Sequence, residues 1–265
     1  MRNVILGSLL LGLSVSAHAV SFKNVINGVW NSGLDNNAVL LTSASPDSHF
    51  VLIKPQGCAV PNPPASCNGF GPNALVVVGP PTNGTWPGGN GTASQWVGPR
   101  ADQSAVGPNG VFASSTDFYV YRMIFNLSSL GLWAHTAEVS LRWTADNNMD
   151  AVNFPSADSH VRICSIPDPA NRTVCGTTVP NSKAGNEKTN PFDTAPVVNI
   201  DSSYFTAGFM ALDFIVYNAP IVIGENPTGL RVEILSATAD PVPEPMTFAM
   251  LGLGLLGIGL YSRRK

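Results

Sequence analysis

The stretch YVYRMIFNL, residues 119–127, carries a large apolar or aromatic side chain at every second position. Successive side chains of a β-strand point to opposite faces of the sheet, so this period of two predicts a strand with one buried face. The polar face carries Arg122 and Asn126. The buried face is predicted to comprise Tyr119, Tyr121, Met123, Phe125 and Leu127.

The same alternation recurs along the chain and sets the fold class. Residues 137–143 alternate apolar side chains with Glu138, Ser140 and Arg142, and residues 230–234 alternate them with Arg231 and Glu233. No amphipathic helix separates these segments, so we expect an all-β protein, an antiparallel β-sandwich or jelly roll with long loops. Residues 79–110 and 167–196 are predicted to be the main loop-rich segments. Further strands are predicted at residues 49–54, 75–78, 160–164 and 210–217.

Composition limits the class of protein. The 25 glycines and 22 prolines make up about 18% of the 265 residues, below the share of about 25–30% typical of disordered sequence. Residues 20–240 are therefore predicted to fold as one domain. They hold 10 basic and 16 acidic side chains, a net charge of −6. This acidic body has no Lys/Arg cluster, which argues against nucleic-acid binding.

The N-terminus has the pattern of a secretory signal peptide. Arg2 precedes the apolar run 4–15, and Ala17 and Ala19 form a small-residue A-x-A cleavage pattern. We expect a signal helix in residues 1–19 that signal peptidase removes after Ala19. The alternative, an uncleaved anchor, is disfavoured because the run is too short to span about 30 Å of hydrocarbon.

Four cysteines form two local pairs, Cys58 with Cys67 and Cys164 with Cys175. An exported chain keeps disulfides, and two local bridges are the simplest of the three possible connectivities. A zinc site is the alternative. Neither pair has the C-x-x-C spacing that such sites favour, so disulfides are the stronger expectation.

The C-terminus combines an apolar run with a basic tip. Residues 246–261 carry no charge and would form a helix of about 24 Å, which is marginal for a membrane span. Arg263, Arg264 and Lys265 follow the run and would stay on the cytoplasmic side under the positive-inside rule. The body would then lie outside the cell, tethered through this transmembrane helix.

A short motif precedes this helix: Val242, Pro243, Glu244 and Pro245. Together with the glycine- and leucine-rich run and the basic tip, residues 242–265 closely resemble the PEP-CTERM sorting signal. The resemblance implies recognition and cleavage by an exosortase, first as a membrane-anchored precursor and then as a protein of the cell surface or of the exopolysaccharide matrix of a bacterial biofilm. Both prolines favour extended backbone around Glu244, as a protease-like enzyme requires. The alternative is an ordinary linker before an ordinary anchor.

Parts of the body resemble a recurrent ectodomain of PEP-CTERM proteins. The resemblance implies a galactose-binding-like β-sandwich, a class of domain that mostly lacks an assigned activity. The matching pieces are residues 31–36 (NSGLDN), 94–97 (SQWV), 142–147 (RWTADN) and 226–233 (NPTGLRVE).

Two kinds of ligand site are suggested within the body. Asp146, Asn148 and Asp150 space oxygen ligands as a calcium loop would, although an Asn/Asp turn that caps its own backbone is the favoured alternative. Trp86 and Trp96 lie in or beside polar loops, where an indole face could stack on a sugar ring. Packing that anchors the loops is again the favoured alternative. No other cofactor is expected.

The sequence contains neither a G-x-S-x-G nor an H-E-x-x-H motif. The leading hypothesis is therefore a non-catalytic surface or matrix protein that binds exopolysaccharide. The second hypothesis is a secreted hydrolase that acts on such a polymer, and the third is a structural coat protein that binds no glycan.

Overall fold

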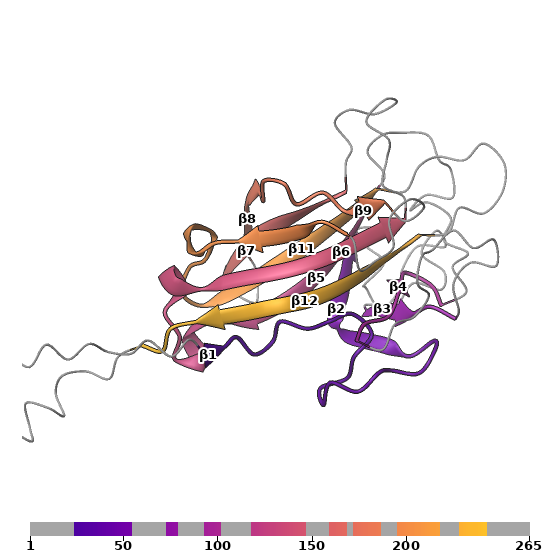
Figure 1. Ribbon diagram of the computed structural model, residues 1–265, viewed down its shortest axis with the longest axis horizontal. Helices are drawn as coiled ribbons and strands as arrows, with labels where there is room; N and C mark the ends of the chain where they lie inside the picture. Colours follow the sequence, from indigo (N-terminus) through magenta and orange to yellow (C-terminus); the bar gives the residue numbers. More distant parts are fainter. Residues whose placement is uncertain are drawn as a thin grey trace, which may run out of the picture.

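The computed structural model describes residues 24–54, 73–78, 93–101, 118–146, 159–168, 172–186, 195–217 and 228–242 (Figure 1). Within these ranges, twelve strands belong to one sheet, with the order β10-β6-β12-β4-β3-β2-β5-β11-β7-β8; β1 pairs with β12, and β9 with β6. The strands are β1 (Asn24–Val25), β2 (Pro46–Lys54), β3 (Asn73–Val76), β4 (Val97–Gly98), β5 (Phe118–Asn126), β6 (Glu138–Asp146), β7 (His160–Asp168), β8 (Arg172–Thr178), β9 (Gly185–Asn186), β10 (Val197–Ile200), β11 (Phe209–Tyr217) and β12 (Gly229–Ala239).

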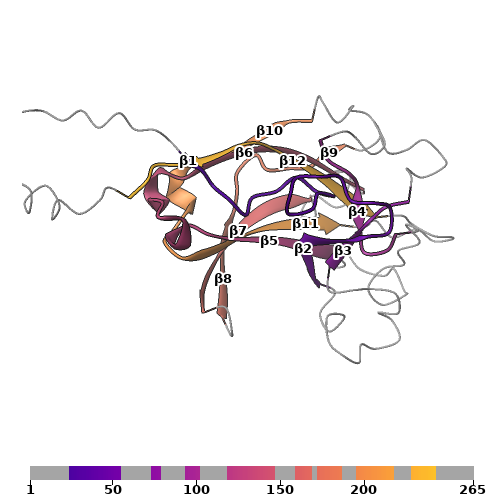
Figure 2. The ribbon, with the colours of Figure 1, turned by 90° about the horizontal axis from the view of Figure 1, so that it is seen from below.

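The sheet curls over into two layers, which Figure 2 shows edge on. Strands β10, β6 and β12 form one layer, and β2, β5, β11 and β7 form the other. The two layers are continuous because Val97 of β4 pairs with Leu230 of β12 on one side and with Val76 of β3 on the other. The all-β prediction is confirmed, and the sandwich-like body is one curled sheet. Among the described strands, pairing is antiparallel along the main path and parallel between β9 and β6.

All seven predicted strands are found, as β2, β3, β5, β6, β7, β11 and β12. The loop prediction for residues 167–196 was wrong in part, because β8 and β9 lie there. Strand β8 gave no alternating signal, since Thr173, Val174 and Gly176 are all exposed. Its pairing with β7, rather than a buried face, defines it.

The core lies between the two layers. Tyr119, Tyr121, Met123, Phe125 and Leu127 are each at most 3% exposed, which confirms the predicted buried face. Across the layers, the ring of Trp143 on β6 meets Phe214 on β11 edge to face, with centroids 5.5 Å apart. The Trp143 indole N–H donates to the backbone oxygen of Ser182 at 3.0 Å. The main core between the layers is therefore rich in aromatic side chains and holds the layers together.

Tyr121 makes this core sensitive to alkaline pH. Its hydroxyl is buried and has no hydrogen-bond partner among the described residues. Burial, with a smaller contribution from Tyr119, raises the pKa of Tyr121 well above its ordinary value of 10.0. The phenol ionises near pH 10 in the unfolded chain but stays neutral in the folded chain. The contribution of Tyr121 to the free energy of unfolding is therefore constant below pH 10 and declines above it.

We expect Tyr121→Phe to remove this decline, a difference of about 1 kcal/mol at pH 10.5 in urea unfolding, while costing less than about 1 kcal/mol at pH 7. Tyr217→Phe is the matched control, because Tyr217 is only half-buried and its pKa is raised less strongly. An identical pH dependence in wild type and Tyr121→Phe would contradict the expectation.

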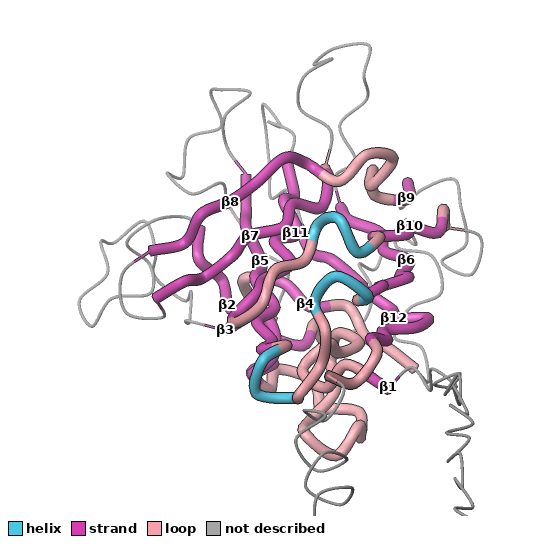
Figure 3. Tube along the Cα trace, turned by 90° about the vertical axis from the view of Figure 1, so that its left-hand side faces the viewer, coloured by secondary structure: helices cyan, strands magenta, loops and turns pink. Residues whose placement is uncertain are grey.

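The strands run between two ends of the body, here called the base and the tip. The base comprises Asn24, the 3-10 helices η2 (Ser128–Leu130), η3 (Ala134–Thr136) and η5 (Ser202–Tyr204), and residues 240–242. Figure 3 views the molecule from this end, with the short helices in cyan. Because Asn24 pairs with Ala239, the first and last described residues both lie at the base. The tip carries the opposite strand ends, at Lys54, Phe118, Asp146, His160, Tyr217 and Gly229.

The two predicted terminal helices, residues 1–19 and 246–261, lie outside the described residues. None of the helices within the described ranges has the length and apolar character needed to cross a membrane.

Candidate functional site

The described part of the chain ends at Val242, the first residue of the predicted sorting motif. Three hydrogen bonds hold the last residues to the base: Trp133 N–H to Asp240 O at 2.9 Å, Asp240 N–H to Thr136 Oγ1 at 2.8 Å, and Val242 N–H to Gly131 O at 2.7 Å. Val242 is the last described residue. Pro243 follows Val242 in the sequence and has no backbone N–H to donate.

A shallow groove adjoins this exit point. It has a volume of about 550 Å³ and is lined mainly by apolar side chains, among them Leu132, Trp133, Phe205 and Val242. Trp133 is 38% exposed and Val242 is 46% exposed. The ring of Trp133 lies 4.7 Å from that of His135, centroid to centroid. The base thus presents aromatic and aliphatic surface beside the start of the tail.

The predicted bridge between Cys164 and Cys175 is confirmed. It joins two residues that face each other across β7 and β8. The zinc alternative for this pair is wrong, because both sulfurs are bonded to each other. Cys58 and Cys67 lie outside the described residues, so their bridge stays a prediction.

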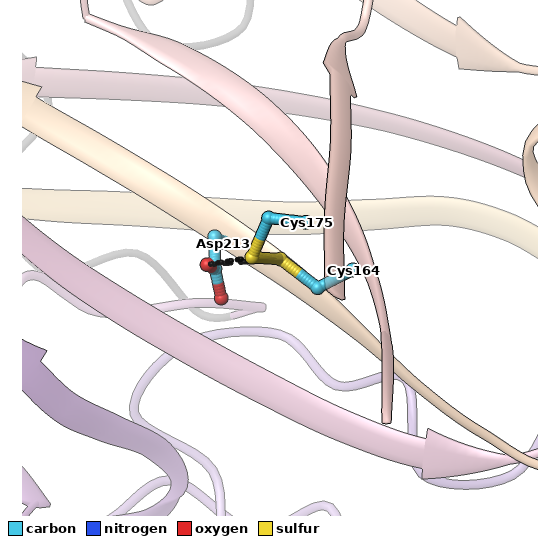
Figure 4. A group of neighbouring side chains, drawn as sticks. All are labelled: Cys164, Cys175 and Asp213. Atoms are coloured by element: carbon cyan, nitrogen blue, oxygen red, sulfur yellow. Dashed lines mark hydrogen bonds between the residues drawn. A yellow bond between two sulfur atoms is a disulfide. The ribbon is translucent and has the colours of Figure 1, made fainter. Parts of the chain in front are cut away.

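A buried carboxylate lies against this disulfide (Figure 4). Oδ2 of Asp213 is 3.2 Å from Sγ of Cys164, and the Asp213 side chain is fully buried. Asp213 lies on β11, and its cross-strand neighbours are Arg122 on β5 and Arg162 on β7. Arg122 donates to both carboxylate oxygens, at 2.6 and 2.8 Å, and Arg162 donates to Oδ2 at 2.8 Å.

The cluster of Cys164, Cys175 and Asp213 is the group with the composition of a metal site among the described residues. Its two sulfur atoms are bonded to each other in the disulfide. The carboxylate oxygens already accept hydrogen bonds from two guanidinium groups. A cation there would face two positive charges at close range, so the arrangement is that of a structural ion cluster.

The predicted sugar-stacking role of Trp96 is contradicted. Trp96 is only 1% exposed and packs against Val77, so neither face of its ring is open to a ligand. The loop prediction for residues 79–110 is corrected accordingly, because the described part, residues 93–101, runs through the interior. Trp86 lies outside the described residues.

The predicted calcium ligands are only partly placed. Asp146 ends β6 at the tip and is 4% exposed, and its backbone oxygen accepts a hydrogen bond from Thr228 Oγ1 at 2.7 Å. Asn148 and Asp150 lie outside the described residues, so this site stays a prediction.

Three of the four sequence pieces that resemble an ectodomain type, residues 31–36, 94–97 and 226–233, meet in one buried polar network. Ser32 Oγ donates to Gln95 O at 2.6 Å, and Gln95 Nε2 donates to Gly33 O at 2.9 Å. Arg231 Nε donates to Ser94 Oγ at 2.8 Å. The sequence predicts Arg231 on a polar face of its strand. Other residues cover that face, because the exposed fraction of Arg231 is only 5%. These residues hold segment 31–35 and segment 93–97 onto β12, which is a structural role.

The chain has two parts, an all-β domain that contains a disulfide bond and a C-terminal tail. Residues 241–265 match the family described as the PEP-CTERM protein-sorting motif. The match starts at Pro241, which bridges to Leu132 at the base. No curated protein and no solved structure matches the chain. The galactose-binding-like assignment of the body is not confirmed.

Proposed function

We propose that this chain is an exported surface protein whose tail is cut by an exosortase, and whose non-catalytic body binds exopolysaccharide. One observation carries the proposal: the matched motif begins at the base of the body, where Val242 N–H donates to Gly131 O, and Pro243 to Pro245 follow Val242 directly in the sequence. A transpeptidase-like enzyme needs an extended, accessible substrate. The two prolines that flank Glu244 favour extended backbone, and they follow directly on the base of the body.

The disulfide supports export. Cys164–Cys175 is a cross-strand bridge of the kind that persists in oxidising compartments and is rare in the cytosol. A signal peptide in residues 1–19 would direct the chain there and would then be removed by signal peptidase. The membrane-held precursor, with residues 246–261 as its anchor and a cytoplasmic C-terminus, would then be the exosortase substrate.

The direction of the strands supports a binding role for the tip. A chain tethered at its base points the tip outward, and the 11 residues of β12 set the two ends about 35 Å apart. Asp146 and the strand ends that flank the segments containing Trp86 and Cys58 lie at or near the tip. A polymer outside the membrane would reach this end of the body first.

The ion cluster around Asp213 supports a non-catalytic role for the body. Asp213 is fully buried, and its oxygens accept from Arg122 and Arg162, so it is poorly placed to transfer a proton to a substrate.

Intact mass spectrometry of the mature protein tests the proposal. In a host that has an exosortase, we expect the purified chain to lack residues 1–19 and residues 246–265. The triple variant Pro243→Ala, Glu244→Ala, Pro245→Ala is expected to keep its C-terminus. Glu138→Ala, an exposed acidic change in the body, is the matched control and should be processed like the wild type.

A mature wild-type mass that still includes Arg263 to Lys265 would overturn the sorting assignment. The role of the body has its own readout: the mature protein is mixed with polysaccharide of its host. Retention without release of fragments supports binding, release of fragments would establish the hydrolase instead, and absence of retention would establish the coat-protein alternative.

A further inference from the structure

The exposed apolar side chains at the base gather around the point where the tail leaves. Trp133 is 38% exposed, Phe209 39%, Val242 46% and Val25 68%. Phe209 starts β11 opposite Asn126, and Val25 pairs with Thr238 of β12, so both lie at the same end as Trp133 and Val242. These four residues are here called the base patch. Trp133 and Val242 also line the same groove, and exposed apolar surface of this kind is typical of contact sites.

The sequence limits what can lie beneath the base patch. Three residues, Pro243, Glu244 and Pro245, separate Val242 from the apolar run that starts at Met246. Fully extended, this connection spans at most about 14 Å. The polar headgroup zone is about 5–8 Å thick on each side of a bilayer. While the tail is uncut, the base patch is therefore held at the headgroup zone or only just above it.

We propose that the base patch rests on the membrane surface and is a lipid-contact site of the uncut precursor. This proposal rests on the proposed function, because it requires residues 246–261 to enter the bilayer. Trp133 is the central contact, since indole rings favour the boundary between headgroups and hydrocarbon, and the adjoining groove beside Val242 offers apolar surface to the acyl chains.

The charges at the base indicate which lipids are preferred. Asp240 is partly exposed at the base, Glu138 and Asp201 are exposed beside it, and the described part of the base carries no Lys or Arg. Contact is therefore apolar and aromatic rather than electrostatic. Anionic headgroups should not strengthen it, and added salt should not release it.

The test uses the full-length precursor, made without exosortase and reconstituted into phosphatidylcholine vesicles. Lipids brominated at chosen depths quench the fluorescence of tryptophans that touch them. We expect shallow-brominated lipid to quench wild type, and Trp133→Phe to remove most of that quenching. Trp30→Phe is the matched control, because Trp30 stacks on His49 beside the middle of β12, away from the base.

Flotation of the same vesicles separates the two proposals. If the precursor floats with the vesicles but wild type and Trp133→Phe are quenched equally, the lipid-contact site is overturned and the anchor stands. If the precursor does not float, both are overturned. Quenching that depends on Trp133 and is unchanged by 20% anionic lipid or by 0.5 M salt would establish the site.

Discussion

Replacing Asp213 by alanine is expected to lower the free energy of unfolding by about 3–5 kcal/mol, because it leaves a buried guanidinium without its counter-charge. Arg122 is only 9% exposed and directs two hydrogen bonds at the Asp213 carboxylate. It lies beneath β8, where Thr173 Oγ1 accepts from its Nη1 at 3.0 Å. Covered in this way, Arg122 has no easy route to solvent. Urea unfolding of the oxidised protein at pH 7 measures the loss.

Two companion variants separate the ion cluster from simple loss of packing. Arg162→Met should cost much less than Asp213→Ala, since the Arg162 side chain is 30% exposed and Arg122 still neutralises Asp213. The double variant Asp213→Ala, Arg122→Met should recover part of the loss, because no uncompensated buried charge remains. A loss below about 1 kcal/mol for Asp213→Ala would show that the cluster contributes little.

The sequence allows the inner faces of the sheet to be predicted, and the structure shows why. A side chain that faces the core in a two-layer body must be apolar, and its neighbours along the strand need not be, so period two appears in residues 119–127 and 137–143. The Cys164–Cys175 bridge was also predictable, because two cysteines that are close in the sequence of an exported chain have few other cysteines with which to pair. The tail motif was recognisable because its parts follow one another without a break.

The outer faces could not be predicted, because what covers them comes from distant parts of the chain. The alternation along β5 predicts that Arg122 faces solvent, but the β7–β8 hairpin covers it. The alternation along β12 predicts the same for Arg231, yet Ser94 covers it across 137 positions of sequence. Trp96 was placed near the surface by its polar neighbours, but those neighbours are the buried network itself. Periodicity reports a strand's own faces and carries no signal for a hydrogen bond made to another segment.

One residue of that network makes its geometry testable. Gly33 adopts φ +76°, a left-handed conformation, and its N–H donates to Oδ2 of buried Asp47 at 2.7 Å. A Cβ at this position would lie 2.5 Å from Cβ of Gln95. The clash involves the root of the Gln95 side chain, so no change of rotamer relieves it and one of the two backbones must move. Glycine is therefore required here for space as well as for conformation.

We expect Gly33→Ala to lower the free energy of unfolding by about 3 kcal/mol or more, combining the left-handed backbone, the overlap and the strained hydrogen bonds around Gln95. Gly131→Ala is the matched control: Gly131 has φ +62° but open space within 4 Å of its would-be Cβ, so about 1 kcal/mol is expected. Urea midpoints at constant m-value give both numbers. Equal losses in the two variants would mean that segment 31–35 does not pack against segment 93–97 as described. A larger loss at Gly33 would establish that this buried polar network, built from sequence pieces up to 200 positions apart, holds segment 31–35 in place.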